Sequence, residues 1–182
     1  AGASIRWSSR ARRRPTILNR SLGWRCLGAS LLGAAGVVAF APVGWFPANW
    51  LSLGGLFGLL CAAAGGQGQV RHGALIAAAY GLGQFLTGVS WVYVSLSVFG
   101  GMPAALAGLA TLLFCGVLAI FPALAGALFV RLAAPGFWPR ALLFAAVWVL
   151  TEGLRAWVFT GFPWLSAGYS QTPPSPLAGY VP

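Results

Sequence analysis

The sequence contains almost no acidic side chains: Glu152 is its single acid, and lysine and aspartate are absent. The lack of aspartate excludes a Ser-His-Asp triad, and His72 is the only histidine available for a Cys-His site. The cysteines at 26, 61 and 115 (Cys26, Cys61 and Cys115) are far apart and show no CxxC spacing, so neither a disulfide framework nor a zinc site is expected. We therefore expect no catalytic residue, no metal and no cofactor in this chain.

Charge of any kind is scarce. Charged residues make up 7% of the chain and hydrophobic residues 59%, whereas soluble domains carry about 25% charged residues. So few charges cannot cover a surface that faces water, and lipid is expected to be the solvent for most of the chain. We predict an all-α fold, a polytopic membrane helix bundle.

The basic residues are all arginine, and their distribution is uneven. Seven of the eleven arginines lie at or before Arg25, and the others are single residues. This pattern is typical of membrane topology signals and differs from a basic face that binds phosphates. We expect no nucleic-acid partner.

Apolar runs divide the remainder of the chain into about five candidate membrane helices. A span needs about 20 residues to cross roughly 30 Å of hydrocarbon, so the first two runs are short and could tilt little or be joined by a membrane-embedded turn. The segment 1–25 is expected to be a cytoplasmic tail; an Arg- and Ser-rich transit peptide is the alternative. The transmembrane domain would cover 26–159, with 160–182 as a periplasmic loop leading to a missing remainder. The predicted spans lie near 26–41, 48–64, 73–96, 104–130 and 141–159.

The loop arginines predict the orientation of the bundle. Arg71, Arg131 and Arg140 lie in alternate loops, whereas 42–47, 97–103 and 160–182 contain no arginine. Arginine favours the cytoplasmic side of short loops. We predict a cytoplasmic N-terminus and an outer location for 160–182.

Glu152 and Arg155 both fall inside the fifth predicted span. Their spacing of three places them on one helix face, and an unpaired charge at mid-bilayer costs about 2.5–3.5 kcal/mol on insertion scales. We predict a structural ion pair that faces protein. A contact with a lipid head group or with a catalytic domain above the membrane is the functional alternative.

Aromatic residues gather toward the predicted outer face. An interfacial aromatic belt explains such a cluster, and a rim that binds lipid is the functional alternative. Separately, the spacing of Gly54 and Gly58 predicts close helix packing. The outer aromatic residues are Trp45, Phe46, Trp50, Trp91, Tyr93, Phe99, Phe162, Trp164 and Tyr169.

Two stretches go beyond composition. The first, residues 88–95, reads GVSWVYVS and continues as VFGGMP at 98–103. The second, residues 151–165, reads TEGLRAWVFTGFPWL and continues as GYSQ at 168–171. Together with a weaker turn, FAPVGW at 40–45, they resemble the N-terminal membrane region of bacterial apolipoprotein N-acyltransferases. The resemblance covers about residues 25–182.

The resemblance implies an enzyme of the bacterial inner membrane. Such enzymes move an acyl chain from a phospholipid to the α-amino group of a diacylglyceryl-cysteine at a lipoprotein's N-terminus. They have eight membrane helices and a periplasmic nitrilase-like domain with a Glu-Lys-Cys triad, and the reaction passes through a thioester. By resemblance and position, Tyr93, Phe162 and Trp164 are the candidate substrate contacts. Membrane lipids around the bundle are expected as further partners.

This chain cannot assemble that triad from its own residues, because it has no lysine and its one acid lies in the membrane. We expect a fragment that is inactive alone and that anchors and positions the catalytic domain. A small multi-pass transporter or channel that uses Glu152 and Arg155 is the alternative, and a structural membrane scaffold is a third.

Overall fold

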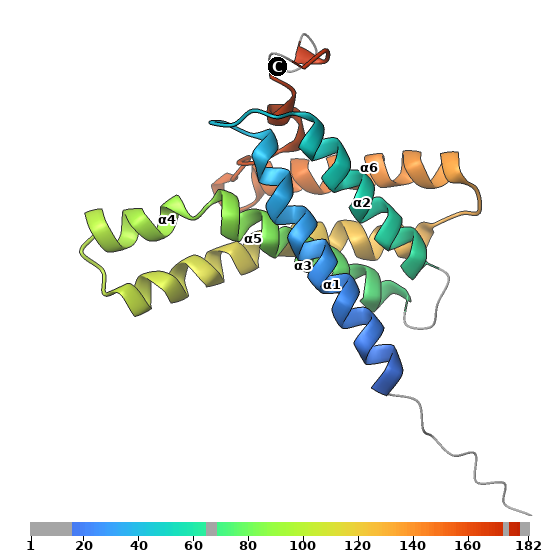
Figure 1. Cartoon of the computed structure of the whole chain (residues 1–182), viewed down its shortest axis with the longest axis horizontal. Coiled ribbons are helices and arrows are strands. Elements are labelled where there is room, and N and C mark those ends of the chain that lie inside the picture. Colours follow the sequence, from blue (N-terminus) through green and yellow to red (C-terminus); the bar gives the residue numbers. More distant parts are fainter. Residues whose placement is uncertain (1–15, 65–68, 173–174, 179–182) are drawn as a thin grey trace, which may run out of the picture.

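The computed structural model describes residues 16–64, 69–172 and 175–178 (Figure 1). Within these ranges the chain is helical and has no strand, which confirms the predicted all-α fold. Most of the Arg-rich tail, residues 1–15, lies outside the described residues. The α-helices are α1 (Thr16–Gly36), α2 (Pro47–Ala63), α3 (Gln69–Gly88), α4 (Trp91–Val94), α5 (Ala104–Leu132) and α6 (Phe137–Trp157). The short elements are η1 (Val37–Ala39), η2 (Ser95–Phe99, a π-helix), η3 (Val158–Thr160) and η4 (Ala167–Gln171).

The apolar runs of the sequence correspond to helices, but not all of them are clear membrane spans. Three described helices are long and apolar enough to cross a membrane: Ser21–Ala39, Ala104–Leu132 and Phe137–Trp157. A fourth is reached if the bent pair Val70–Gly88 and Trp91–Phe99 forms one span. Helix α2 is apolar but has 17 residues, about 26 Å of helix against roughly 30 Å of hydrocarbon. The fifth span therefore stays a prediction.

The predicted span over 73–96 is broken into two pieces in the structure, and a single crossing by both pieces stays a prediction. The chain bends by 49° between Gly88 and Trp91, and it then continues through α4 into the π-helix η2. The side chain of Leu165 fills the space beside the bend: a Cβ at Gly88 would lie 2.5 Å from its Cδ1 atom. The bend is thus packed against a segment that follows 77 positions later in the chain.

Helices α1 and α3 approach closely because glycine removes side chains from their contact. A Cβ at Gly33 would collide with the backbone carbonyl of Tyr80, and one at Gly83 with that of Ser30. Small residues of this kind let membrane helices pack backbone to backbone. They place α3 against α1 on one side.

The opposite side of α3 packs on α5 by the same means. Gly73 and Gly126 face each other, and a Cβ on either would collide with the other helix. The predicted pair on α2 behaves differently: a Cβ at Gly54 or Gly58 would meet nothing within 4 Å. The packing prediction for that pair is wrong, because both glycines face away from the neighbouring helices.

The arginines predicted in loops lie instead at helix ends, near the start of α3 (Arg71), the end of α5 (Arg131) and the start of α6 (Arg140), and these helix ends lie at one end of the bundle. Figure 1 shows the end of α2, the start of α3 and the turn between α5 and α6 on its right side, whereas α4 and the segment after α6 lie away from it. Arg25 Nη1 donates to the carbonyl of Ala62 at 3.4 Å, which brings the early part of α1 to the same end as the α2 terminus. This arrangement agrees with the arginine pattern, and the orientation in a membrane stays a prediction.

Candidate functional site

The segment 160–172, here called the outer segment, folds back over the end of α6. Thr160 and Gly161 have φ angles of 81° and 82°, a region that residues with side chains rarely adopt. A Cβ at Gly161 would collide with the backbone of Ala156. The reversal is closed by a hydrogen bond from the Phe162 N–H to the carbonyl of Arg155 at 3.0 Å.

The guanidinium of Arg155 holds the main chain of the outer segment. Its Nη1 atom donates to the carbonyl oxygens of Phe162 and Trp164, both at 2.6 Å. Its Nη2 atom donates to Ser166 Oγ at 3.0 Å. Arg155 is only 3% exposed, and hydrogen bonds from a charged donor are roughly twice as strong as neutral ones. This side chain therefore fixes the path of the segment.

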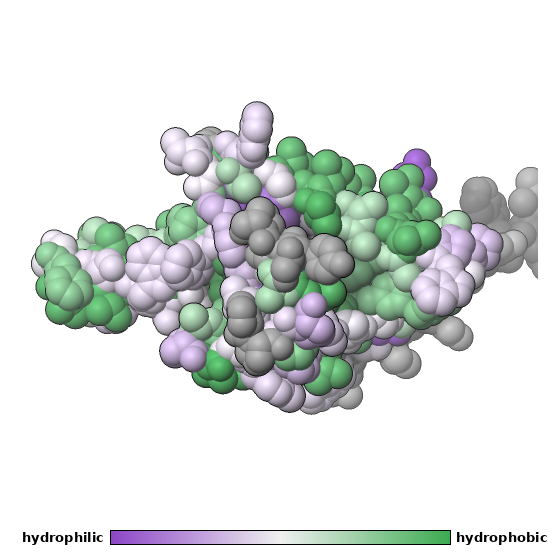
Figure 2. Space-filling model, turned by 90° about the horizontal axis from the view of Figure 1, so that it is seen from above, coloured by the Kyte–Doolittle hydropathy of each residue, from purple (hydrophilic) through white to green (hydrophobic). Residues whose placement is uncertain are grey.

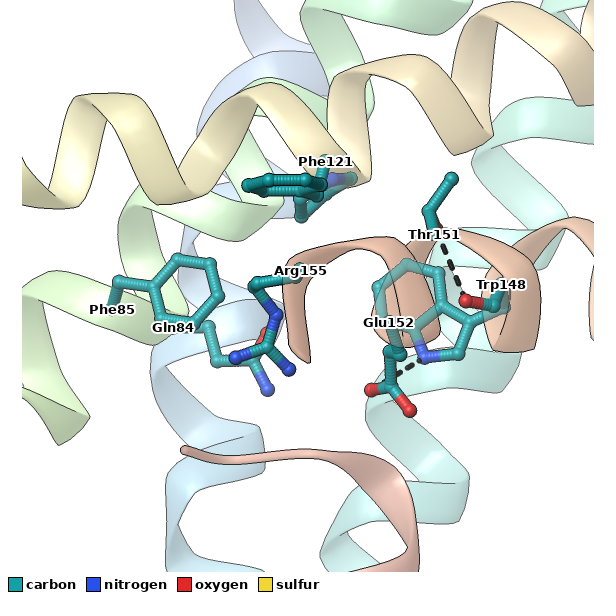
Figure 3. A pocket seen from close by; sticks show the side chains of 8 residues that line it. Gln84, Phe85, Phe121, Trp148, Thr151, Glu152 and Arg155 are labelled. Atoms are coloured by element: carbon teal, nitrogen blue, oxygen red, sulfur yellow. Dashed lines mark hydrogen bonds between the residues drawn. The ribbon is translucent and has the colours of Figure 1, made fainter. Parts of the chain in front are cut away.

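An aromatic ring and an amide extend the same contact. The guanidinium carbon of Arg155 lies 5.3 Å from the centre of the Phe85 ring, within the range of a cation–π interaction. The amide of Gln84 donates to the carbonyl of Leu165 at 3.4 Å. Figure 3 shows Gln84, Phe85 and Arg155 pointing toward one another from α3 and α6. Both helices thus hold the outer segment together.

Glu152 binds the next part of the segment. The backbone N–H of Ala167 donates to both carboxylate oxygens, at 3.0 and 3.2 Å, and the indole N–H of Trp148 donates to one of them at 3.0 Å. Glu152 and Arg155 share one face of α6, as their spacing predicts. Their hydrogen bonds, however, go to the outer segment and to Trp148 rather than to each other. Both charged side chains therefore bind the outer segment.

A small pocket lies between these charges and α5. It is lined by residues that include Phe121, Trp148, Glu152 and Arg155, and its volume is about 10 Å³ (Figure 3). A site of this size has room for about one water molecule. The interior around the two charges is therefore closely packed.

Polar side chains at the start of α2, in the outer segment and just after it form a hydrogen-bond network. Asn49 Nδ2 donates to Ser170 Oγ at 2.9 Å, and Gln171 Nε2 donates to the same oxygen at 2.8 Å. Ser175 Oγ donates to Gln171 Oε1 at 2.8 Å. All four residues are buried, and buried polar groups of this kind are stable only when hydrogen-bonded. The network ties the segment to α2.

A groove of about 590 Å³ opens beside the outer segment, at the bend between α3 and α4. Trp164 forms one wall: it is 50% exposed, and its indole N–H donates to the carbonyl of Gly88 at 3.3 Å. Trp91 packs edge-on against it with ring centroids 5.9 Å apart. Most of the lining is apolar, as in sites for small molecules. The lining residues are Val37, Phe40, Ala41, Gly88, Trp91, Pro163, Trp164, Leu165, Tyr169 and Thr172.

The structure separates the three residues that the sequence suggests as substrate contacts. Trp164 lines the groove. Phe162 packs against the ring of Phe114 at 5.1 Å and joins an apolar core. Tyr93 lies on α4, is 39% exposed and does not line the groove. Only Trp164 is therefore placed at this cavity, and a substrate role for any of the three stays a prediction.

Two polar residues of the site were not singled out from the sequence. Gln84 and Asn49 are 4% and 3% exposed, and each lies inside or at the start of an apolar run. A polar amide in such a run needs a partner, because an unsatisfied polar group in hydrocarbon costs several kcal/mol. That was the available signal. It shows that a partner is needed but does not identify it.

Long apolar helices with large exposed hydrophobic side chains, together with a groove at one end, define a polytopic helical membrane protein. Comparison with known proteins then gives the family. Residues 32–182 match the family model described as the apolipoprotein N-acyltransferase N-terminal domain. This match covers most of the chain, and the chain belongs to the apolipoprotein N-acyltransferase family.

Curated relatives agree with this assignment. The chain is 51% identical over 111 residues to an apolipoprotein N-acyltransferase of Nitrosomonas europaea, an alignment that covers 60% of the chain and 22% of the relative. It is 46% identical over 135 residues to that of Ralstonia nicotianae, covering 72% and 25%. For Methylococcus capsulatus the identity is 54% over 94 residues, covering 51% and 19%. The matched part thus spans a quarter or less of these relatives.

Proposed function

We propose that this chain supplies the membrane-embedded part of an apolipoprotein N-acyltransferase in a bacterial inner membrane, with its N-terminus in the cytoplasm. The enzyme would transfer an acyl chain from a phospholipid to the N-terminal diacylglyceryl-cysteine of a lipoprotein. The observation that carries the proposal is the match of residues 32–182 to the N-terminal domain of this family. The groove at Trp164 supports the proposal, because its lining is mostly apolar and aromatic.

The catalytic groups are proposed to lie outside these 182 residues. Transfer through a thioester needs a thiolate, a group that handles protons and a cationic donor for the oxyanion. The chain has no lysine, and the hydrogen bonds of Glu152 and Arg155 are taken up by the outer segment. Its role would be to anchor and position the catalytic domain at the membrane surface.

The groove is the proposed contact with the acyl chain of a lipid substrate. Its walls are apolar and aromatic, and the indole N–H of Trp164 is already bonded to Gly88. An apolar chain could therefore fill the groove without leaving a buried polar group unpaired. Tyr169 and Thr172 also line the groove, and their hydroxyl groups are the proposed partners of a lipid's ester region.

The transporter alternative is not favoured by the geometry of the two charges. A coupling or gating pair must exchange partners or line a wet path. Arg155 makes three hydrogen bonds to the outer segment, and the adjoining pocket holds about 10 Å³. Both charges are explained by the segment that they hold.

A chimeric enzyme tests the proposal. Residues 32–182 would replace the matching part of the Nitrosomonas europaea relative, and N-acylation of a diacylated lipoprotein would be followed by mass spectrometry. We expect acyl transfer by the chimera in a strain depleted of its own enzyme. A chimera that inserts and folds yet transfers nothing would contradict the proposal, with the parent relative as positive control.

A further inference from the structure

Helix α4, the π-helix η2 and the first part of α5 form a projecting hairpin, here called the arm (residues 91–113). Figure 1 shows it extending to the left, away from the other helices. The turn at its tip uses Gly101, whose φ angle is 64°. Apart from contact between its own two sides, most of the arm has no helix packed around it among the residues that the structure describes.

The exposed surface of the arm is apolar. Val98 and Phe99 near the tip are 68% and 84% exposed, and Figure 2 shows the arm in green, white and pale purple, without the deep purple of strongly hydrophilic residues. The sequence contains no Asp, Glu, Lys or Arg between Arg71 and Arg131. An apolar surface of this kind on a protein marks contact with a membrane or another protein.

A continuous stripe of exposed apolar residues on α5 favours a membrane over another protein as the partner of the arm. Its residues recur every three or four positions, so they share one helix face, and all are exposed. The whole stripe lies on the candidate membrane span Ala104–Leu132. Its first three residues belong to the arm, and no charged residue interrupts it between the arm and the rest of the span. The stripe consists of Leu106, Leu109, Leu113, Val117, Ile120, Leu124 and Leu128.

Two hydroxyl groups of the arm bond to main-chain carbonyls within the arm. Ser97 Oγ donates to the carbonyl of Tyr93 at 2.8 Å, and Thr111 Oγ1 donates to that of Ala107 at 2.8 Å. At the root, Ser90 Oγ donates to the carbonyl of Thr87 at 3.1 Å. Internal bonds of this type allow serine and threonine to enter hydrocarbon, where water is absent.

The length of α5 sets how deep the arm can lie. Its 29 residues correspond to about 44 Å of helix, whereas the hydrocarbon layer is about 30 Å thick. An upright helix would lift the apolar tip beyond the lipid head groups into water. A helix longer than the bilayer can instead tilt, and the 49° bend between α3 and α4 lets the other side of the arm follow.

We propose that the arm lies slanted in the outer leaflet, with its tip around Phe99 among phospholipid acyl chains close to the head groups. Its partner is therefore lipid, and neither water nor a second protein covers the tip. This inference takes the outer side from the predicted arginine topology and otherwise rests on the arm, and it holds whether or not the proposed acyl transfer is correct. It also fixes the level of Trp91, at the root of the arm, relative to the membrane surface.

Site-directed fluorescence tests this placement. The whole chain, with Cys26, Cys61 and Cys115 replaced by alanine, would carry Phe99→Cys labelled with an environment-sensitive dye in vesicles of phosphatidylethanolamine and phosphatidylglycerol. Lipids with a nitroxide near the head group or at the chain end would serve as quenchers from the membrane, and iodide as quencher from water. Leu113→Cys on the stripe and Ala134→Cys in the turn after α5 are matched controls.

The expected result is blue-shifted emission at position 99 that is quenched most by the shallow nitroxide lipid and little by iodide. Position 113 should be quenched more by the deep nitroxide, and position 134 by iodide. Quenching of position 99 by iodide alone would place the tip in water and overturn the proposal. Protection of position 99 from all three quenchers would mean that a protein surface, such as a second copy, covers it. That result would also overturn the proposal.

Discussion

A hydrogen bond links Arg155 to Trp164: the side-chain Nη1 of Arg155 donates to the main-chain carbonyl oxygen of Trp164 at 2.6 Å. The same side chain also binds the carbonyl of Phe162 and the hydroxyl of Ser166. A single buried cation thereby sets the position of the indole that forms one wall of the groove. Changes at Arg155 should consequently appear at the outer segment before they appear in the rest of the bundle.

Replacement of Arg155 by lysine tests the hydrogen bonds between this side chain and the outer segment. Lysine keeps the charge but lacks the planar fork that reaches several acceptors at once. We expect faster amide hydrogen exchange across the outer segment and a loss of stability of about 2 kcal/mol, the size of hydrogen bonds to a charged group. Exchange measured by mass spectrometry and unfolding in detergent would detect both effects.

Arg140→Lys is the matched control, because Arg140 makes one exposed hydrogen bond, to the carbonyl of Ala134. It should leave the outer segment unchanged. Equal exchange in the two variants would refute the assigned role of Arg155.

Glu152 should act on the adjacent part of the segment in a graded way. Glu152→Gln retains one side-chain oxygen as acceptor, whereas Glu152→Leu removes both acceptors from the N–H groups of Ala167 and Trp148. We expect a stability loss of about 1 kcal/mol for glutamine and a larger one for leucine, since an orphaned buried donor costs about 1–3 kcal/mol. Thermal unfolding in a mild detergent would rank the variants. A leucine variant as stable as the parent would speak against this contact.

The sequence was informative where the pattern is local. Apolar runs predicted α2 and α5 to within a few residues, since hydrophobic length and flanking glycine or proline mark helix ends. The spacing of Glu152 and Arg155 predicted their common face. Their partners were not predictable, because the outer segment returns to α6 through positive φ angles at Thr160 and Leu165. Neither residue type signals such a conformation.

Long-range packing explains the remaining differences. The bend after Gly88 packs against Leu165, 77 positions away, and hydrophobicity along 73–96 alone does not indicate it. Glycine spacing on α2 suggested a contact, whereas the close approaches use Gly33 and Gly83 on α1 and α3. A glycine pattern shows where helices could meet, and only the tertiary arrangement decides which glycines are used.

Trp164 should matter more for transfer than a tryptophan elsewhere. In the chimeric enzyme, Trp164→Ala is expected to lower acyl transfer by about tenfold, because it removes a wall that positions substrate. Trp164→Phe should retain part of the activity. Trp24→Ala is the control, since Trp24 lies on α1, is 73% exposed and is remote from the groove. Equal and negligible effects of both alanine variants would reduce Trp164 to an interfacial belt residue.

The orientation of the bundle can be tested with reporter fusions. Arginine at the helix ends at 71, 131 and 140 predicts that this end of the bundle faces the cytoplasm. A fusion at Arg71 should report a cytoplasmic location, and one at Gln171 a periplasmic location. Alkaline phosphatase and green fluorescent protein, which are active on opposite sides, give complementary signals. The same location for both positions would refute the topology.

The chain by itself should form no acyl-enzyme. Cys115 is fully buried among apolar side chains that include Phe85 and Leu165, and a thiol in such surroundings is not activated as a nucleophile. Purified residues 1–182 in phospholipid should therefore contain no hydroxylamine-sensitive acyl group by mass spectrometry, whereas the chimeric enzyme with a complete catalytic domain should contain one. An acyl thioester on Cys115 that disappears in Cys115→Ala would show that this chain performs the first half of the reaction alone. The catalytic groups would then have to be sought around α5 and the groove.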